Sequence, residues 1–126
     1  MNNLINLGVL AQLGDAVHYL KTIEANLYKV SDSSELHKKV SEIVSAQSQA
    51  NLLDFIKPQL SEIETDIVRR ARNIKLTRRT KIKQSIYRLA TSFEVLIGYL
   101  HLNDLPRLDY IIKLCQEYDD NLPKIK

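Results

Sequence analysis

The stretch YRLATSFEVLIGYL at residues 87–100 decides the fold, because its apolar side chains recur with the period of a helix that is buried along one face. The residues on that face are Ile86, Leu89, Ala90, Phe93, Leu96, Ile97 and Leu100. Glu94 lies four residues after Ala90 and three before Ile97, so we expect it to project from the same face. An unpaired ionised carboxylate there would cost on the order of several kcal/mol, which a divalent cation shared with a second acid would offset.

A second acid lies in a comparable setting near the N-terminus. Asp15, within LGDAV (13–17), is beside the apolar stripe of another predicted helix. The stripe consists of Leu10, Leu13, Val17, Leu20, Ile23 and Leu27. Small residues that would let two helices approach closely flank the acids: Gly14, Ala16 and Gly98. We therefore expect the helices of Asp15 and Glu94 to pack face to face and their carboxylates to share a cation; a structural ion pair for each acid is the alternative.

The other apolar periods predict an all-α protein with five main helices. We expect them at about 4–28 (or 10–28), 35–53, 61–68, 84–102 and 105–115. Two capping boxes, Asp32 with Glu35 and Ser61 with Glu64, begin the second and third helices, and Pro58 interrupts the pattern between them. The length predicts one domain over residues 1–126, with its core at about 7–118 and a polar, fraying tail at 119–126.

The composition is that of a soluble globular domain, with 44% hydrophobic and 26% charged residues over 126 positions. No stretch reaches the roughly 18–20 apolar residues of a membrane span, and residues 1–10 lack the basic region of a secretory signal. The single cysteine, Cys115, suits a reducing compartment and argues against a structural zinc site. We therefore expect a cytoplasmic protein, or one of an organelle stroma, with no membrane partner and with Cys115 packed in the core.

The charge is unevenly distributed although the net charge is only +3. Nine Lys and Arg residues lie between Asp66 and Glu94 without one acid, whereas the remainder of the chain has nine basic and fifteen acidic residues. The basic segment 73–84 also lacks an apolar period, so we interpret it as a loop. Such segregation favours a polyanionic partner, and a solvated charged loop is the alternative.

Several segments, in this order along the chain, carry a family resemblance: LGDAV (13–17), LHKK (36–39), VSAQSQA (44–50), RARN (70–73) and YRLATSFEVLIGYL (87–100). With them the chain resembles ribonuclease III catalytic domains over about residues 7–118, and most closely the Mini-III group, which lacks a separate double-stranded-RNA-binding domain. The resemblance implies an all-helical ribonuclease III endonuclease-domain bundle that works as a homodimer. It also implies cleavage of double-stranded RNA with Mg²⁺ or Mn²⁺ to leave a 5′ phosphate and a 3′ hydroxyl, and a role in maturation of ribosomal RNA, namely the large-subunit precursor.

The resemblance also assigns roles to single residues. Asp15 corresponds to the catalytic metal-binding aspartate of the family and Glu94 to its glutamate partner. Larger ribonuclease III enzymes carry further acids at the positions of Ala11 and Thr91, so a tightly held second metal ion is in doubt here. The subfamily pattern RGRN reads RARN, with Ala71 in place of glycine.

The basic segment would supply the contacts to RNA phosphates, because duplex RNA is recognised mainly through its backbone and 2′-hydroxyl groups. The candidates are Arg70, Arg72, Asn73, Lys75, Arg78, Arg79, Lys81 and Lys83, together with His37 and Lys38. Asn73 is equally a candidate helix C-cap, and His37 and Lys38 equally an exposed helix start.

Three further polar residues have open roles. His18, three residues after Asp15, is either a neighbour of the metal ligands or, as expected more often, a satisfied or solvated histidine. Ser45 and Gln49, one helical turn apart, are candidates to contact the RNA minor groove or a partner chain.

The sequence thus predicts a metal-dependent, double-stranded-RNA endoribonuclease with one Asp15/Glu94 centre in each protomer of a dimer. A non-catalytic RNA-binding or scaffolding protein of ribosome assembly, on the same fold, would keep the basic segment without needing the acids. A helical protein-interaction adaptor would need neither.

Overall fold

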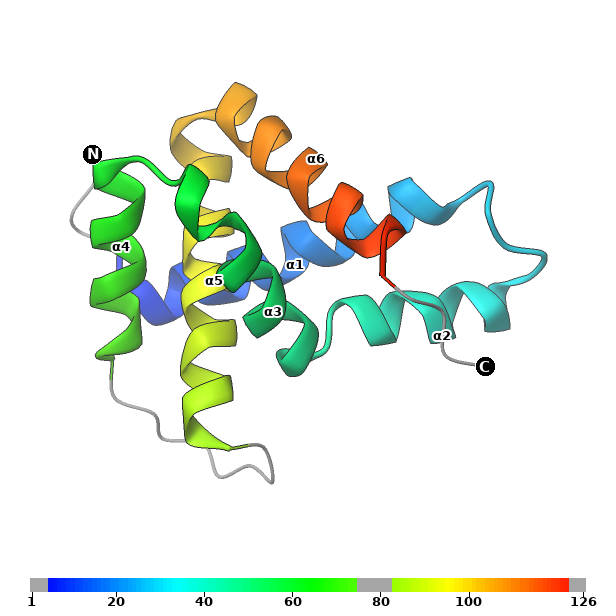
Figure 1. The fold of residues 1–126 in the computed structure, drawn as a ribbon, viewed down its shortest axis with the longest axis horizontal. Coiled ribbons are helices and arrows are strands. Elements are labelled where there is room, and N and C mark those ends of the chain that lie inside the picture. Colours follow the sequence, from blue (N-terminus) through cyan, green and yellow to red (C-terminus); the bar gives the residue numbers. More distant parts are fainter. Residues whose placement is uncertain (1–4, 75–82, 123–126) are drawn as a thin grey trace.

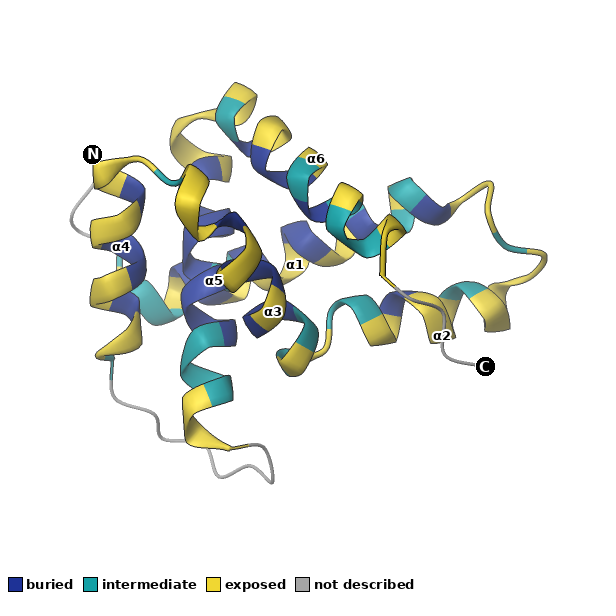
Figure 2. Cartoon of the chain, viewed as in Figure 1, coloured by how far each residue is buried: buried dark blue, intermediate teal, exposed yellow. Residues whose placement is uncertain are grey.

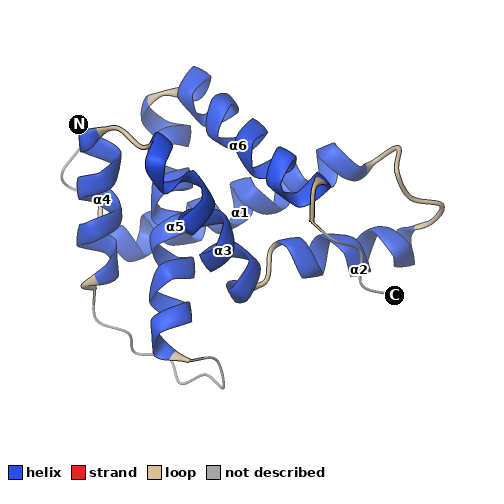
Figure 3. Cartoon of the chain, viewed as in Figure 1, coloured by secondary structure: helices blue, strands red, loops and turns tan. Residues whose placement is uncertain are grey.

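The protein is all-helical, as predicted, in the computed structural model, which describes residues 5–74 and 83–122. The helices are α1 (Leu7–Asn26), α2 (Ser33–Ile43), α3 (Ala46–Ile56), the short 3₁₀ helix η1 (Lys57–Gln59), α4 (Glu62–Arg72), α5 (Gln84–Asn103) and α6 (Leu105–Asp120). Figure 3 shows that the described residues form helices and loops without a strand. None of their helices is long and apolar enough to cross a membrane.

Helix α5 is the centre of the bundle (Figure 1), and α1, α3, α4 and α6 all pack against it. Phe93, Leu96, Ile97 and Leu100 of the predicted face are 0–1% exposed, but Ser92 and Val95 outside that face are equally buried, and Ile86 and Leu89 at its start are only half-buried. Helices α3 and α6 complete the core with Leu52, Leu53, Ile56, Leu108, Ile111 and Cys115. Figure 2 shows that burial is concentrated around α5 and that α2, at one end of the molecule, is mostly exposed.

The predicted second helix is wrong in one respect, because the structure divides it into α2 and α3. The break is at Ser45, whose Oγ accepts a hydrogen bond from the Ser48 backbone N–H at 3.2 Å and so caps α3. The apolar residues of α2 and α3 lie close enough in the sequence to suggest one helix, but the mostly polar run SAQSQ at residues 45–49 interrupts their period.

The buried face of α1 also differs from the prediction. Leu20 and Leu27 of the predicted stripe are 52% and 48% exposed, whereas Thr22 and Asn26 are buried. The buried polar side chains bond within the helix: Thr22 Oγ1 donates to the His18 carbonyl at 2.7 Å, and Asn26 Nδ2 donates to the Thr22 carbonyl at 2.8 Å. An exposed apolar stripe therefore runs along the outer face of α1.

Both predicted capping residues hold their helix ends. Asp32 accepts from the Glu35 backbone N–H, although the Glu35 carboxylate reaches back to Ser31 instead of Asp32. Ser61 and Glu64 form the complete reciprocal box at 3.2 and 2.8 Å.

Glu64 has a second role that fixes α6. Its buried carboxylate accepts two hydrogen bonds from the Arg107 guanidinium, at 2.8 and 2.9 Å, and so ties the start of α6 to the start of α4. Burial alone would raise the pKa of Glu64, but the bonds from Arg107 and Ser61 hold it below its ordinary value. The other end of α6 continues to Asp120, so the predicted polar tail begins inside the helix.

Candidate active site

Helices α1 and α5 cross with their backbones in direct contact, and two glycines make this approach possible. A Cβ at Gly14 would collide with the Glu94 carbonyl oxygen and lie 2.9 Å from the Gly98 nitrogen. A Cβ at Gly98 would collide with the Leu10 carbonyl oxygen. The predicted face-to-face packing of the two helices is therefore present. Ala16, predicted to belong to the same contact, is exposed.

The crossing brings Asp15 and Glu94 side by side. The Glu94 backbone contacts Gly14, the residue before Asp15. The carboxyl groups of Asp15 and Glu94 are close enough to share a hydrogen bond. Asp15, predicted to lie beside the apolar stripe, is exposed, and Glu94, predicted to project from a buried face, is half-buried. Asp15 lies one position beyond the contact face of α1, so its side chain reaches solvent at the rim of the crossing.

The environment of Glu94 disfavours its ionised form. Burial, the hydrogen bond to Asp15 and the negative charge of Asp15 raise the pKa of Glu94 to about 8. The two carboxylates of this pair cannot both ionise at neutral pH without repelling each other. A bound cation would remove that repulsion.

The donor set fits a hard divalent cation held with few protein ligands. Carboxylate oxygens are the ligands that Mg²⁺ prefers, and Mg²⁺ keeps several of its waters, so one or two acids can hold it. The described residues contain no cluster of three or more His, Cys, Asp and Glu side chains that would form a fuller cage. The exposed position of Asp15 leaves room for water molecules and a phosphate around such an ion.

A third helix reaches this site through Gln49. The side chain of Gln49, from α3, is 2% exposed and lies within hydrogen-bonding reach of the Glu94 carboxyl group, and its Nε2 is 3.1 Å from His18 Nδ1. His18 is also 2% exposed, its ring meets that of Phe93 edge to face at 5.0 Å, and burial lowers its pKa to about 4. The ring is therefore neutral at pH 7.

The burial of Gln49 corrects the expectation that it faces RNA or a partner chain, whereas Ser45 remains exposed. A signal in the sequence could have placed it, because Gln49, Leu52, Leu53 and Ile56 follow the i, i+3, i+4, i+7 rule. On α1 the predicted stripe is buried at Leu10 and Val17, and the remainder of the buried face consists of small and polar residues: Ala11, Gly14, His18, Thr22 and Asn26.

The basic candidates that the structure describes lie at two helix ends. Arg70 and Arg72 are exposed in the last turn of α4, and Lys83 is exposed at the start of α5. Asn73 is the C-cap residue of α4, and its Nδ2 donates to the Arg69 carbonyl at 3.2 Å. Lys75, Arg78, Arg79 and Lys81 are outside the described residues.

Arg88, not among the predicted RNA contacts, joins these two ends. Its Nη1 donates to the carbonyl oxygens of Arg72 at 2.9 Å and of Ile74 at 3.1 Å, so a residue of α5 caps the end of α4. A shallow hollow of about 630 Å³ lies here, lined by Arg69, Arg72, Asn73, Ser85, Arg88 and Leu89. His37 and Lys38 are exposed on α2.

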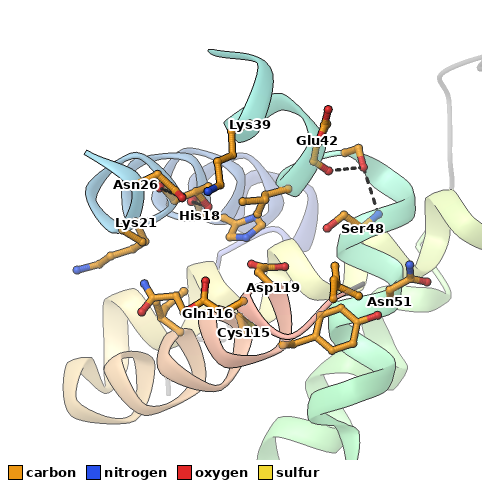
Figure 4. A pocket seen from close by; sticks show the side chains of 18 of the residues that line it. His18, Lys21, Asn26, Lys39, Glu42, Ser48, Asn51, Cys115, Gln116 and Asp119 are labelled. Atoms are coloured by element: carbon orange, nitrogen blue, oxygen red, sulfur yellow. Dashed lines mark hydrogen bonds between the residues drawn. The ribbon is translucent and has the colours of Figure 1, made fainter. Parts of the chain in front are cut away.

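A larger hollow, of about 1120 Å³, lies between α1, α2, α3 and α6 and contains neither acid of the pair. Figure 4 shows His18 and Asn26 of α1 on one wall and Cys115, Gln116 and Asp119 of α6 on another. The acid pair itself lies at an open rim. An open site suits a large substrate that presents a phosphate to the surface better than a small molecule that needs enclosure.

Comparisons with known proteins show which family and which fold the chain resembles. Residues 8–105 match the family described as the ribonuclease III domain. The chain is similar to the Mini-ribonuclease 3 of Gloeobacter violaceus, at 40% identity over 90% of this chain and 84% of the relative. It is similar to the Mini-ribonuclease 3 of Brevibacillus brevis at 43% identity, over 80% of this chain and 77% of the relative.

A solved structure has the same fold. The crystal structure of a Fusobacterium nucleatum protein superposes with a TM-score of 0.81 and 29% sequence identity, over 94% of each chain.

Proposed function

The chain belongs to the ribonuclease III family, with Mini-ribonuclease 3 proteins as its relatives, and from this premise we propose that it is a metal-dependent endonuclease of double-stranded RNA. The observation that carries the proposal is the meeting of Asp15 and Glu94 at the crossing of α1 and α5. Seventy-eight residues separate the two acids in the sequence, and each of their helices has a glycine at the contact.

Asp15 and Glu94 would together hold one Mg²⁺, or Mn²⁺ in its place. Such an ion lowers the pKa of a bound water and neutralises charge on the phosphate during phosphodiester hydrolysis. Asp15 reaches the ion from the exposed rim, and Glu94 anchors it from the half-buried side. Mutual repulsion within the pair supports this role, because a cation removes the cost of ionising Glu94.

The basic residues at the end of α4 and the start of α5 would hold the RNA backbone. Arg70, Arg72 and Lys83 are exposed and flank the segment that continues the run of positive charge. Their affinity would be independent of base sequence and would fall steeply with salt. The exposed His37 and Lys38 of α2 are further candidates.

The protein would act as a homodimer whose two centres each cut one strand of a duplex. The outer stripe of α1 supports this proposal, because Val9, Leu20 and Leu27 are 58%, 52% and 48% exposed on one helix face. A second copy would remove these side chains from water, and sedimentation equilibrium tests for it. We further propose the large-subunit ribosomal RNA precursor, in the cytoplasm, as the substrate.

The test compares the wild type with Asp15→Asn on a short RNA duplex with and without Mg²⁺, and with single-stranded RNA as the control substrate. The proposal predicts cleavage by the wild type, dependent on Mg²⁺ and on the duplex, and binding without cleavage by Asp15→Asn. The scaffold alternative predicts equal binding and no cleavage by either protein. A crystal soaked in Mn²⁺ would then test directly whether density lies between Asp15 and Glu94.

A further inference from the structure

Gln49 occupies an unusual place for a glutamine, because it is buried and contacts both of the helices that carry the acids. It belongs to α3, is 2% exposed, and its side chain lies within hydrogen-bonding reach of the Glu94 carboxyl group of α5. Its Nε2 also lies 3.1 Å from Nδ1 of His18 on α1. An amide nitrogen carries two hydrogens, so one side chain can donate to the imidazole and to the carboxylate together.

The partner of Gln49 on α1 is itself held firmly. The His18 ring packs edge to face against Phe93, the residue before Glu94, with centroids 5.0 Å apart. A neutral imidazole has one nitrogen that accepts a hydrogen bond, which suits Nδ1 as the acceptor from Gln49. His18 lies one helical turn after Asp15, so the link His18–Gln49–Glu94 joins the two acids through side chains as well as through the glycine crossing.

We propose that Gln49 is a positioning residue of the acid pair, which holds the Glu94 carboxylate in the orientation it shares with Asp15 and is itself held by His18. Gln49 does not touch RNA in this role, because it is buried beneath the site. The inference rests on the proposed function, since it takes the pair to be the site of a cation. Residues that orient metal ligands typically change metal affinity about 10–100-fold when they are replaced.

A purely structural role for this buried glutamine predicts something different. Removal of the amide would then lower the stability of the fold and leave the cation affinity of the folded protein unchanged. Stability and cation affinity therefore have to be measured separately, on the protein without RNA.

The experiment measures Mn²⁺ affinity by electron paramagnetic resonance, together with urea unfolding, for the wild type and Gln49→Met. Methionine has nearly the same shape but donates no hydrogen bond. Thr22→Val is the matched control, because it also removes a buried hydrogen-bond donor, but one that bonds only to the His18 carbonyl. Gln47→Met is a second control, because Gln47 is an exposed glutamine of the same helix that pairs with Asn51.

We expect Gln49→Met to bind Mn²⁺ about tenfold more weakly than the wild type, and both controls to bind within twofold of it. On duplex RNA, kcat should fall while KM stays near the wild-type value, because Gln49 is not expected to touch the substrate. His18→Leu, which removes the support of Gln49 and leaves the amide, should weaken Mn²⁺ about threefold and gives a second variant if Gln49→Met does not fold.

Wild-type Mn²⁺ affinity in folded Gln49→Met, or in folded His18→Leu where the first variant cannot be purified, would overturn the inference and leave the nuclease proposal standing. A wild type that binds no Mn²⁺ and cleaves no RNA would overturn both.

Discussion

The two halves of α1 have opposite surroundings. Its N-terminal half lies against α5 so closely that not even a methyl group fits at Gly14. Its C-terminal half, with Thr22 and Asn26, borders the hollow of about 1120 Å³ between α1, α2, α3 and α6. The acid pair lies at the close contact and not in the hollow. Chemistry that needs two carboxylates at a fixed separation is thus placed where the backbones themselves fix that separation.

The most severe way to break this comparison is Gly14→Ala. The new Cβ would collide with the Glu94 backbone, so the helices must separate, and we expect a loss of at least about 3 kcal/mol in unfolding free energy and loss of cleavage. Gly8→Ala is the matched control on the same helix, because its Cβ meets only the Asn6 side chain, at 3.0 Å. The control should stay within about 1 kcal/mol of the wild type in urea unfolding. Equal stabilities of the two variants would contradict the close contact.

A second test compares the two ends of α6. The start of α6 is tied to the start of α4, whereas its end borders the hollow. Arg107→Met leaves the Glu64 carboxylate buried without its partner and should cost about 2 kcal/mol, less than a fully buried pair because Arg107 is partly exposed. Lys29→Met breaks the exposed pair with Asp120 at 3.3 Å and should change stability by no more than about 0.5 kcal/mol. Urea unfolding at pH 7 measures both, and a similar cost for the two would show that the ends of α6 are held alike.

Glu94→Gln sharpens the comparison by asking what the close contact costs in stability. The pKa of Glu94 is raised to about 8, so the folded protein holds a proton there that the unfolded chain releases near pH 4.5. The contribution of protonated Glu94 to the stability of the fold is therefore fully present below about pH 4.5 and is lost as the pH rises towards 8. The variant should lack this loss and be about 1–2 kcal/mol more stable than the wild type at pH 8 without metal. Thermal melts from pH 5 to 8 measure it, and millimolar Mg²⁺ should raise the Tm of the wild type alone.

The smallest effect is expected in the hollow, from Asp119→Asn. Burial and the charge of Asp120 raise the pKa of Asp119 to about 7, and its Oδ1 has no hydrogen-bond partner among the described residues. The ionised form is disfavoured, so stability falls as the pH rises from about 4 to 7, and asparagine removes that fall. We expect a gain below about 1 kcal/mol at pH 8 and none at pH 4. A gain in stability as large as that of Glu94→Gln would show that the hollow disfavours an ionised carboxylate as strongly as the crossing of α1 and α5 does.

The features that follow a local sequence pattern were predictable from the sequence, and those that depend on contacts between helices were not. The buried face of α5 from Ala90 to Leu100 and the capping box of Ser61 follow local rules, and the structure has both, whereas Ile86 and Leu89 at the start of that face are only half-buried. The division at Ser45 depends on its capping bond to Ser48, and the polar run at residues 45–49 does not by itself distinguish a helix break from an exposed helix face. On α1, the buried face includes Leu10 and Val17 of the predicted stripe and otherwise consists of small and polar residues, because sequence alone does not say which side of the helix meets α5.

The candidate site divides in the same way. Spacing and resemblance singled out Asp15 and Glu94, and the structure places them together, while their role with a cation remains a prediction. Gln49 continues the buried period of Leu52, Leu53 and Ile56, so its burial was predictable from α3, whereas its contact with His18 of α1 was not. Arg88 was counted only as a charge, because its bonds to the end of α4 join residues 14 and 16 positions away.

The backbone contact at Gly14 and Gly98 separates selection for folding from selection for catalysis. In a saturation library screened only for soluble expression, these two positions should accept no substitution, since every side chain begins with the Cβ for which there is no room. Asp15, exposed at the rim, should accept most of them in the same screen. A second screen for RNA cleavage would then restrict Asp15 as well. The adjacent residues 14 and 15 would thus report on two different requirements of the same helix.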